Sequence, residues 1–217
     1  NSAAKSGIPI QRTSLLDIIN NKSSQNLLGT IGKSTNTTRS SATDILRKNN
    51  YAKLEELSEK LDQSAEELVG TDKDSIYDKA KESGDTTDIL GDAKKMVEAY
   101  NATMKQLKTT GGTMNEFYLK QLKDIPAGSK EALESIGITQ SKDGSLSVDE
   151  RVFQNADADT LQKVLGGEKG FASKISFLGE HISKNASENV VSASNRYGSN
   201  GATYMEAFEA NKYNFFG

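Results

Sequence analysis

The stretch of sequence that decides the fold runs from residue 86 to residue 108 and reads TTDILGDAKKMVEAYNATMKQLK. Its apolar residues recur at steps of three and four, which is the spacing of one face of an α-helix. They are Ile89, Ala93, Met96, Val97, Tyr100, Met104 and Leu107. Two glycines at 111 and 112 then interrupt the pattern, as glycine does at helix ends. The stretch therefore predicts an amphipathic helix over 86–108.

Two other segments carry the same pattern. One covers about 42–69, where adjacent asparagines at 49 and 50 predict an interruption, and the other covers about 169–192. Because amphipathic helices bury their apolar stripes against one another, we expect one shared seam, which serves for packing or for self-association. Its expected members are Leu54, Leu57, Leu61 and Leu68, facing Val97, Tyr100, Met104 and Leu107, with Ile175, Leu178 and Ile182 from the last helix.

Shorter helices are predicted between these segments. Residues 72–83 and 129–135 each have the length of two or three turns. Thr113 and Glu116 have the spacing of a capping box, which predicts that a helix begins after Thr113. Pro126 is expected to close that helix, because proline disfavours the helical conformation of the residue before it.

The periodicity changes from helical to alternating between residues 136 and 148. Ile136 and Ile138 precede a polar run that contains Asp143-Gly144, and Leu146 and Val148 alternate beyond it. Alternation on both sides of an Asp-Gly pair is typical of a β-hairpin. The predicted fold class is therefore mainly α, an elongated helical bundle with coiled-coil character and a small β-hairpin lobe.

Composition divides the chain into three parts. Residues 1–40 are predicted to be a flexible basic arm with a net charge of +4, and residues 29–40 to be a linker rich in Ser, Thr and Asn. Residues 41–193 are predicted to form the helical core domain. Residues 194–217 are predicted to be a Gly/Asn-rich tail with an aromatic end. The aromatic residues of the tail are Tyr204, Phe208, Tyr213, Phe215 and Phe216.

The composition of the 217 residues also excludes classes of chemistry. The chain has no Cys and one His, which rules out disulfides, thiol nucleophiles and cysteine zinc sites. The lone His181 lies beside the apolar position Ile182 and is expected at the edge of a helix face. We therefore expect no enzyme, no catalytic residue and no cofactor.

The charge and hydropathy of the chain limit its partners. A net charge of −3 gives no general reason to expect nucleic acid. The sequence contains no apolar run of about 18 residues, so we expect no membrane span.

A degenerate calcium loop is one alternative for residues 139–150. With Gly144 at the sixth position of a 12-residue loop, Glu150 falls at the twelfth, where calcium loops place a bidentate carboxylate. Thr139, Ser141, Asp143 and Ser147 take the first, third, fifth and ninth positions. Hydroxyls replace two of the expected carboxylates, so a tight Asp-Gly turn is the competing interpretation.

Three stretches between about residues 88 and 185 resemble the C-terminal part of the bacterial flagellar filament cap, or flagellar hook-associated protein 2. The first is Val-Glu-Ala-Tyr-Asn at 97–101, followed by further apolar steps. The second combines Leu133 and Ile-Gly-Ile at 136–138 with KDGSLSVDE at 142–150, which is similar to the family pattern L-x-x-I-G-I … D-G-x-L-x-(V/L)-D-E. The third is Val-Leu-Gly-Gly at 164–167. The three follow one another in the family order.

The resemblance implies a helical, partly coiled-coil core that self-associates and helps flagellin subunits assemble at a filament tip. It implies homo-oligomers, flagellin or hook-associated subunits as partners, and an extracellular location on the flagellum or after secretion. A secreted adhesin, which would contact a host surface through the basic arm or the aromatic tail, is an alternative. A calcium-responsive regulator using the loop at 139–150 is another.

Overall fold

The computed structural model describes residues 35–70 and 74–194. The chain divides into two compact units, the first ending at Ile45 and the second beginning at Leu46. Within the described residues, the first unit contains one stretch of helix, residues 35–45, and every other element belongs to the second. The expected arm up to residue 34 and the expected tail from residue 195 lie outside the described residues.

The described residues form eight helices and one two-stranded sheet, which confirms a mainly α fold with a small hairpin. The four long helices are α3 (Thr35–Val69), α5 (Thr87–Thr110), α6 (Thr113–Gly128) and α10 (Phe171–Ser194). The short elements are α4 (Ile76–Ser83), α7 (Lys130–Ser135), β1 (Ile138–Gln140), β2 (Leu146–Val148), α8 (Glu150–Asn155) and α9 (Ala158–Leu165).

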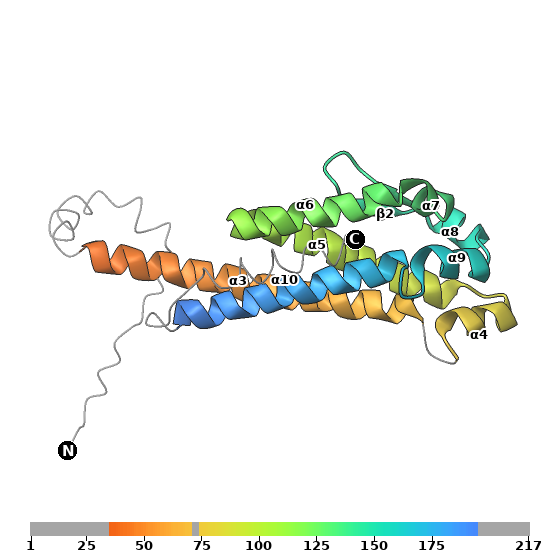
Figure 1. The fold of residues 1–217 in the computed structure, drawn as a ribbon, viewed down its shortest axis with the longest axis horizontal. Coiled ribbons are helices and arrows are strands. Elements are labelled where there is room, and N and C mark those ends of the chain that lie inside the picture. The colour runs from red at the N-terminus through yellow and green to blue at the C-terminus, as the bar shows by residue number, and fades with distance from the viewer. Residues whose placement is uncertain (1–34, 71–73, 195–217) are drawn as a thin grey trace, which may run out of the picture. The chain divides into compact units, whose positions relative to one another are not determined.

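The long helices of the second unit lie side by side as a bundle (Figure 1). Side-chain hydrogen bonds join them in pairs. Thr103 Oγ1 of α5 donates to the Leu57 carbonyl of α3 at 3.1 Å, and Ser176 Oγ of α10 donates to Asp62 Oδ1 of α3 at 2.6 Å. The Tyr118 hydroxyl of α6 donates to the α10 backbone at 3.4 Å. The bundle is therefore tied by polar contacts as well as by its apolar core.

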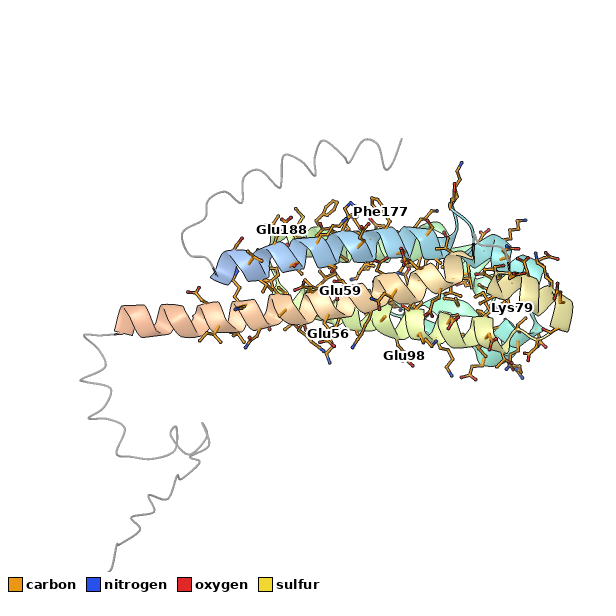
Figure 2. The ribbon with its side chains drawn as sticks, turned by 90° about the horizontal axis from the view of Figure 1, so that it is seen from below. Glu56, Glu59, Lys79, Glu98, Phe177 and Glu188 are labelled. Atoms are coloured by element: carbon orange, nitrogen blue, oxygen red, sulfur yellow. The ribbon has the colours of Figure 1, made fainter. Side chains whose placement is uncertain are left out.

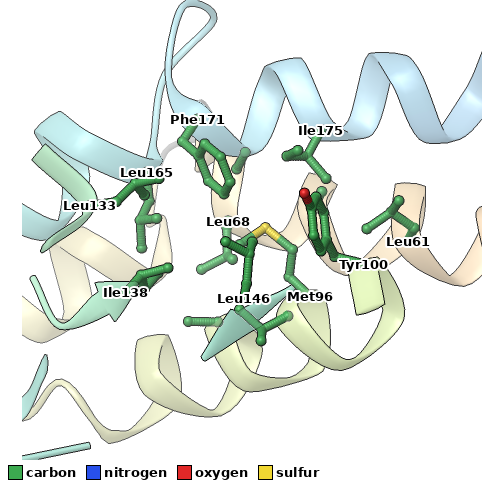
Figure 3. Packing of buried hydrophobic residues seen from close by; sticks show 14 of the residues in the cluster. Leu61, Leu68, Met96, Tyr100, Leu133, Ile138, Leu146, Leu165, Phe171 and Ile175 are labelled. Carbon is green, nitrogen blue, oxygen red and sulfur yellow. The ribbon is translucent and has the colours of Figure 1, made fainter. Parts of the chain in front are cut away.

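The expected seam forms the core of this one chain. All its members are buried except Leu57, which is half-buried. Figure 3 shows Leu61, Tyr100 and Ile175, from three different helices, gathered in one cluster. Because the seam residues are already covered by other parts of the chain, they are not available to pack against a second copy.

Helix α3 departs from the prediction at two points. It begins at Thr35, inside the segment that composition predicted to be a linker, so residues 35–40 are helical. It also continues without interruption through Asn49 and Asn50. The carbonyl of Asn50 accepts hydrogen bonds from Gln106 and Thr110 of α5, and tertiary contacts of this kind override a weak local preference.

Helix α6 departs from the prediction at both ends. The residue at its N-cap is Gly112, and Thr113 is already helical, so the predicted capping box is wrong. The Glu116 N–H instead donates to the Gly112 carbonyl at 2.9 Å. At the other end the helix does not close at Pro126 but includes it and continues to Gly128.

The hairpin has the predicted antiparallel pairing around Asp143-Gly144. Ile138 pairs with Val148, and Gln140 pairs with Leu146. Gly144 has a φ of 95°, a conformation that glycine adopts without steric cost. Ile138 and Leu146 turn into the core. The hairpin is thus part of the same apolar core as the long helices.

Candidate functional site

The hairpin is held against the bundle by the side chain of Asn101 in the middle of α5. Its Nδ2 donates to the Leu146 carbonyl at 2.8 Å, and its Oδ1 accepts from the Leu146 N–H at 2.9 Å. One amide side chain therefore takes both backbone groups of a strand residue that is 45 positions away. This is the pattern that a neighbouring strand would supply, so Asn101 occupies one edge of the hairpin at β2.

Tyr100, the residue before it, makes a second attachment. Its hydroxyl lies 2.7 Å from the Leu122 carbonyl in α6 and 3.2 Å from the Gly144 carbonyl at the tip of the hairpin. The Leu122 carbonyl needs such a donor, because its usual partner in a helix is the N–H four residues on. That residue is Pro126, which has no N–H. Tyr100 thus compensates for the proline and allows α6 to continue past it.

The phenol of Tyr100 is fully buried. Burial raises its pKa, since the charged phenolate would lose its hydration there. The group therefore stays protonated and remains a hydrogen-bond donor. We refer to Tyr100 and Asn101, with Leu146 and Gly144, as the hairpin clamp.

The base of the hairpin is joined to α8 through Gly137 and Asp149. The Asp149 N–H donates to the Gly137 carbonyl at 2.8 Å, and the Asp149 carboxylate accepts from the N–H groups of Arg151 and Val152 at the start of α8. Gly137 has a φ of 82°, and a Cβ there would lie 2.8 Å from the Asp149 carbonyl oxygen. Only glycine fits this position, which explains the Ile-Gly-Ile sequence physically.

The end of α3 is closed by two donors from outside the helix. The Tyr77 hydroxyl donates to the Leu68 carbonyl at 2.6 Å, and the Gly167 N–H donates to the Val69 carbonyl at 2.7 Å. Carbonyls in the last turn of a helix have no partner within the helix. The glycine break before α10 therefore caps α3 as well as separating α9 from α10.

One line of residues along α10 faces outward from the bundle, and we call it the outer stripe. It consists of Phe177, His181, Lys184, Glu188 and Val191, at alternating steps of four and three. Phe177 is 40% exposed and Val191 is 55% exposed. Figure 2 shows Phe177 and Glu188 on the same side of α10. None of the expectations from the sequence included this stripe, because only Phe177 and Val191 at its two ends are apolar.

His181 lies at the edge of a helix face, as its neighbour Ile182 predicted. It is half-buried, its ring stacks on Phe177 with centroids 4.0 Å apart, and its Nδ1 lies 2.8 Å from the Phe177 carbonyl. This geometry gives it a packing role.

Four of the five side chains named for the alternative calcium loop have other partners. Thr139 and Ser147 hydrogen-bond each other across the strands at 2.9 Å. Asp143 accepts from Ser145, and Glu150 pairs with Lys94 of α5 at 2.7 Å. These contacts match the competing interpretation, a tight turn. Within residues 35–70 and 74–194, no three His, Cys, Asp or Glu side chains are grouped so that they could hold a metal ion.

A shallow cleft of about 410 Å³ lies where α4, α8 and α9 meet. Lys81 at its edge pairs with Asp159 at 2.8 Å and donates to Gln162 at 2.7 Å. The residues that line the cleft include no histidine or cysteine. They are Ala80, Lys81, Gly84, Thr86, Gln154, Asn155, Ala156, Asp157, Ala158 and Asp159.

No protein-family model, curated protein or solved structure matches this chain significantly. In the part of the chain that the structure describes, no helix is both long and apolar enough to cross a bilayer.

Proposed function

We propose that this chain is a non-enzymatic assembly protein, similar in its core to the flagellar filament cap. It acts by self-association, and it promotes or terminates the assembly of flagellin or hook-associated subunits outside the cell. The observation that carries the proposal is the hairpin clamp. The Ala-Tyr-Asn stretch and the hairpin stretch, which carry the resemblance, bond to each other directly through Asn101 and Leu146.

The direct contact supports the proposal because it gives the Ala-Tyr-Asn stretch and the hairpin stretch a common structural role, and both stretches resemble the same family. Asn101 has both backbone groups of Leu146 as partners, and Tyr100 reaches the hairpin tip at Gly144. The Gly-Gly stretch at 166–167 is the third match, and it closes the end of α3. All three stretches have roles in holding the fold, which suits a protein that works by shape.

Self-association, in this proposal, uses the outer stripe of α10 against a second copy. The stripe covers 15 residues, or about 21 Å of helix.

The experiment is light scattering after size exclusion, at several protein concentrations. We expect the wild-type mass to rise with concentration, and the double variant Phe177→Ser, Val191→Ser to stay monomeric. Val152→Ser is the matched control, since Val152 is also partly exposed (36%) but lies on α8. A wild-type chain that stays monomeric at every concentration would refute self-association. An oligomer that persists in the double variant would refute the stripe.

A further inference from the structure

The tip of the hairpin contains a dipeptide with a chemistry of its own. In an Asp-Gly pair, the backbone nitrogen of the glycine can attack the side-chain carbon Cγ of the aspartate. The new N–Cγ bond closes a five-membered succinimide, the Cγ–O bond breaks, and one water molecule leaves. Water then reopens the ring, either at Cγ to restore Asp143 or at the main-chain carbonyl to give isoaspartate. Water is the only co-reactant.

Both reacting groups are held by the fold. The nucleophile, the Gly144 nitrogen, donates its hydrogen to the Ser141 carbonyl at 2.9 Å. The electrophile, the Asp143 carboxylate, is turned towards Ser145, where Oδ1 accepts from the hydroxyl at 2.7 Å and from the N–H at 3.0 Å. Closing the ring requires both sets of hydrogen bonds to break.

The ionisation of Asp143 works in the same direction. The Ser145 hydroxyl, followed by the Ser145 N–H, lowers the pKa of the Asp143 carboxyl. The carboxylate therefore stays charged at lower pH, and a charged carboxylate is a poor electrophile because its oxygen cannot leave as water.

The residue after Asp143 is also fixed from the inside of the molecule. The Gly144 carbonyl accepts from Tyr100 at 3.2 Å, and a Cβ at Gly144 would lie 2.7 Å from the Lys123 side chain. The N–H and the carbonyl of Gly144 are thus both anchored. The Gly144 nitrogen cannot turn towards Cγ while the hairpin clamp is closed.

We propose that Asp143-Gly144 is a site of spontaneous isomerisation whose rate is set by opening of the hairpin clamp. In the closed state the reaction is suppressed, and each opening exposes the dipeptide to it. The isoaspartate product carries one extra methylene in the backbone, which displaces the turn by one atom. The displaced turn no longer fits both the β1–β2 register and the Tyr100 contact, so the product is expected to keep the tip of the hairpin open.

The test is incubation of the full-length chain at neutral pH, with isoaspartate measured by methyltransferase labelling and by mass spectrometry of the peptide that begins at Asp143. We compare wild type with Tyr100→Phe, which removes the hydroxyl shared by the Leu122 carbonyl at 2.7 Å and the Gly144 carbonyl at 3.2 Å. The loss of one or two hydrogen bonds makes local opening of the hairpin more frequent, so the rate of isomerisation should rise about three- to tenfold. Asp143→Glu should abolish the signal in this peptide, because its longer side chain would have to form a six-membered ring.

Tyr77→Phe is the matched control. It removes another buried tyrosine hydroxyl, which bonds Leu68 at the end of α3 and does not touch the hairpin. Equal acceleration in Tyr77→Phe and Tyr100→Phe would overturn the proposal, because global unfolding would then set the rate. Equal rates in wild type and Tyr100→Phe would overturn it as well.

Ser145→Ala provides a second variant that does not disturb a buried tyrosine. It removes only the hydroxyl that holds the Asp143 carboxylate, so isomerisation should again be faster than in wild type. Peptide mapping also separates this site from Asn200-Gly201, whose deamidation changes the mass of another peptide. A Ser145→Ala rate no higher than the wild-type rate would contradict the role given to the carboxylate contact.

Discussion

Replacing Tyr100 by Phe should destabilise the protein by an amount that depends on residue 126. The change removes the donor to the Leu122 carbonyl and leaves this buried acceptor without its partner from α5. An unpaired buried backbone group costs about 1–3 kcal/mol of unfolding free energy. In a Pro126→Ala background, the new N–H at position 126 can donate to the same carbonyl in ordinary helical register. The cost of Tyr100→Phe should then fall by about 1 kcal/mol.

The assay is equilibrium unfolding in urea, followed by far-UV circular dichroism, for the wild type, the two single variants and the double variant. Independent sites add to within about 0.5 kcal/mol, so a coupling near 1 kcal/mol is measurable. Tyr77→Phe combined with Pro126→Ala should show no coupling, because the Tyr77 hydroxyl bonds Leu68. If Tyr100→Phe costs the same in the wild-type and the Pro126→Ala backgrounds, then the hydroxyl does not compensate for the proline.

Three further predictions concern the bundle. Gly179→Ala should lower the unfolding free energy by about 1–3 kcal/mol, because the new Cβ would lie 2.9 Å from the Asp62 nitrogen of α3. Gly91→Ala should raise the unfolding free energy, because its Cβ would meet nothing within 4 Å and alanine favours a helix more than glycine does. Thermal melts of the two variants should shift in opposite directions. Leu61→Ala should lower the unfolding free energy by about 2–5 kcal/mol, and Leu57→Ala by less than half of that amount. The reason is that Leu61 is fully buried and Leu57 half-buried. Equal losses of unfolding free energy in urea would be inconsistent with this difference in burial. Desolvation, with a smaller contribution from nearby Glu180, raises the pKa of Asp62 above 3.8, so the folded state holds this proton more tightly and stability falls as pH rises through that region. Asp62→Asn should therefore gain stability relative to wild type as the pH rises above 3.8 through the titration of this carboxyl, and a difference that does not change with pH would contradict the shift.

The helices with clear apolar stripes could be predicted from the sequence. The 86–108 stripe corresponds to α5, which ends at Thr110 before the two glycines, and the Asp-Gly pair marks the hairpin turn. These features depend on local spacing and local backbone preference, which a single sequence contains.

The features that could not be predicted from the sequence depend on contacts between distant residues. Asn101 has no local signal for its role, because its partner Leu146 is 45 residues away. Pro126 has a strong local signal as a helix end, but the Tyr100 hydroxyl of α5 donates to the Leu122 carbonyl in place of the missing N–H, and α6 continues. A buried tyrosine in the middle of an apolar stripe was the one available hint, since its hydroxyl must find a partner inside the protein.

Three buried tyrosines join different parts of the fold through their hydroxyls: Tyr77 to α3, Tyr100 to α6 and the hairpin tip, and Tyr118 to α10. The chain has no tryptophan and seven tyrosines, so its near-ultraviolet absorbance comes mainly from tyrosine, and these three residues contribute part of it. Burial raises the pKa of Tyr77 and of Tyr100 above the ordinary value of 10.0. The stability that their protonated forms contribute is complete below that value and declines as alkali is added above it. In a spectrophotometric titration, phenolate absorbance from these two residues should therefore appear only together with unfolding, which makes tyrosine ionisation a label-free measure of whether the joints are intact.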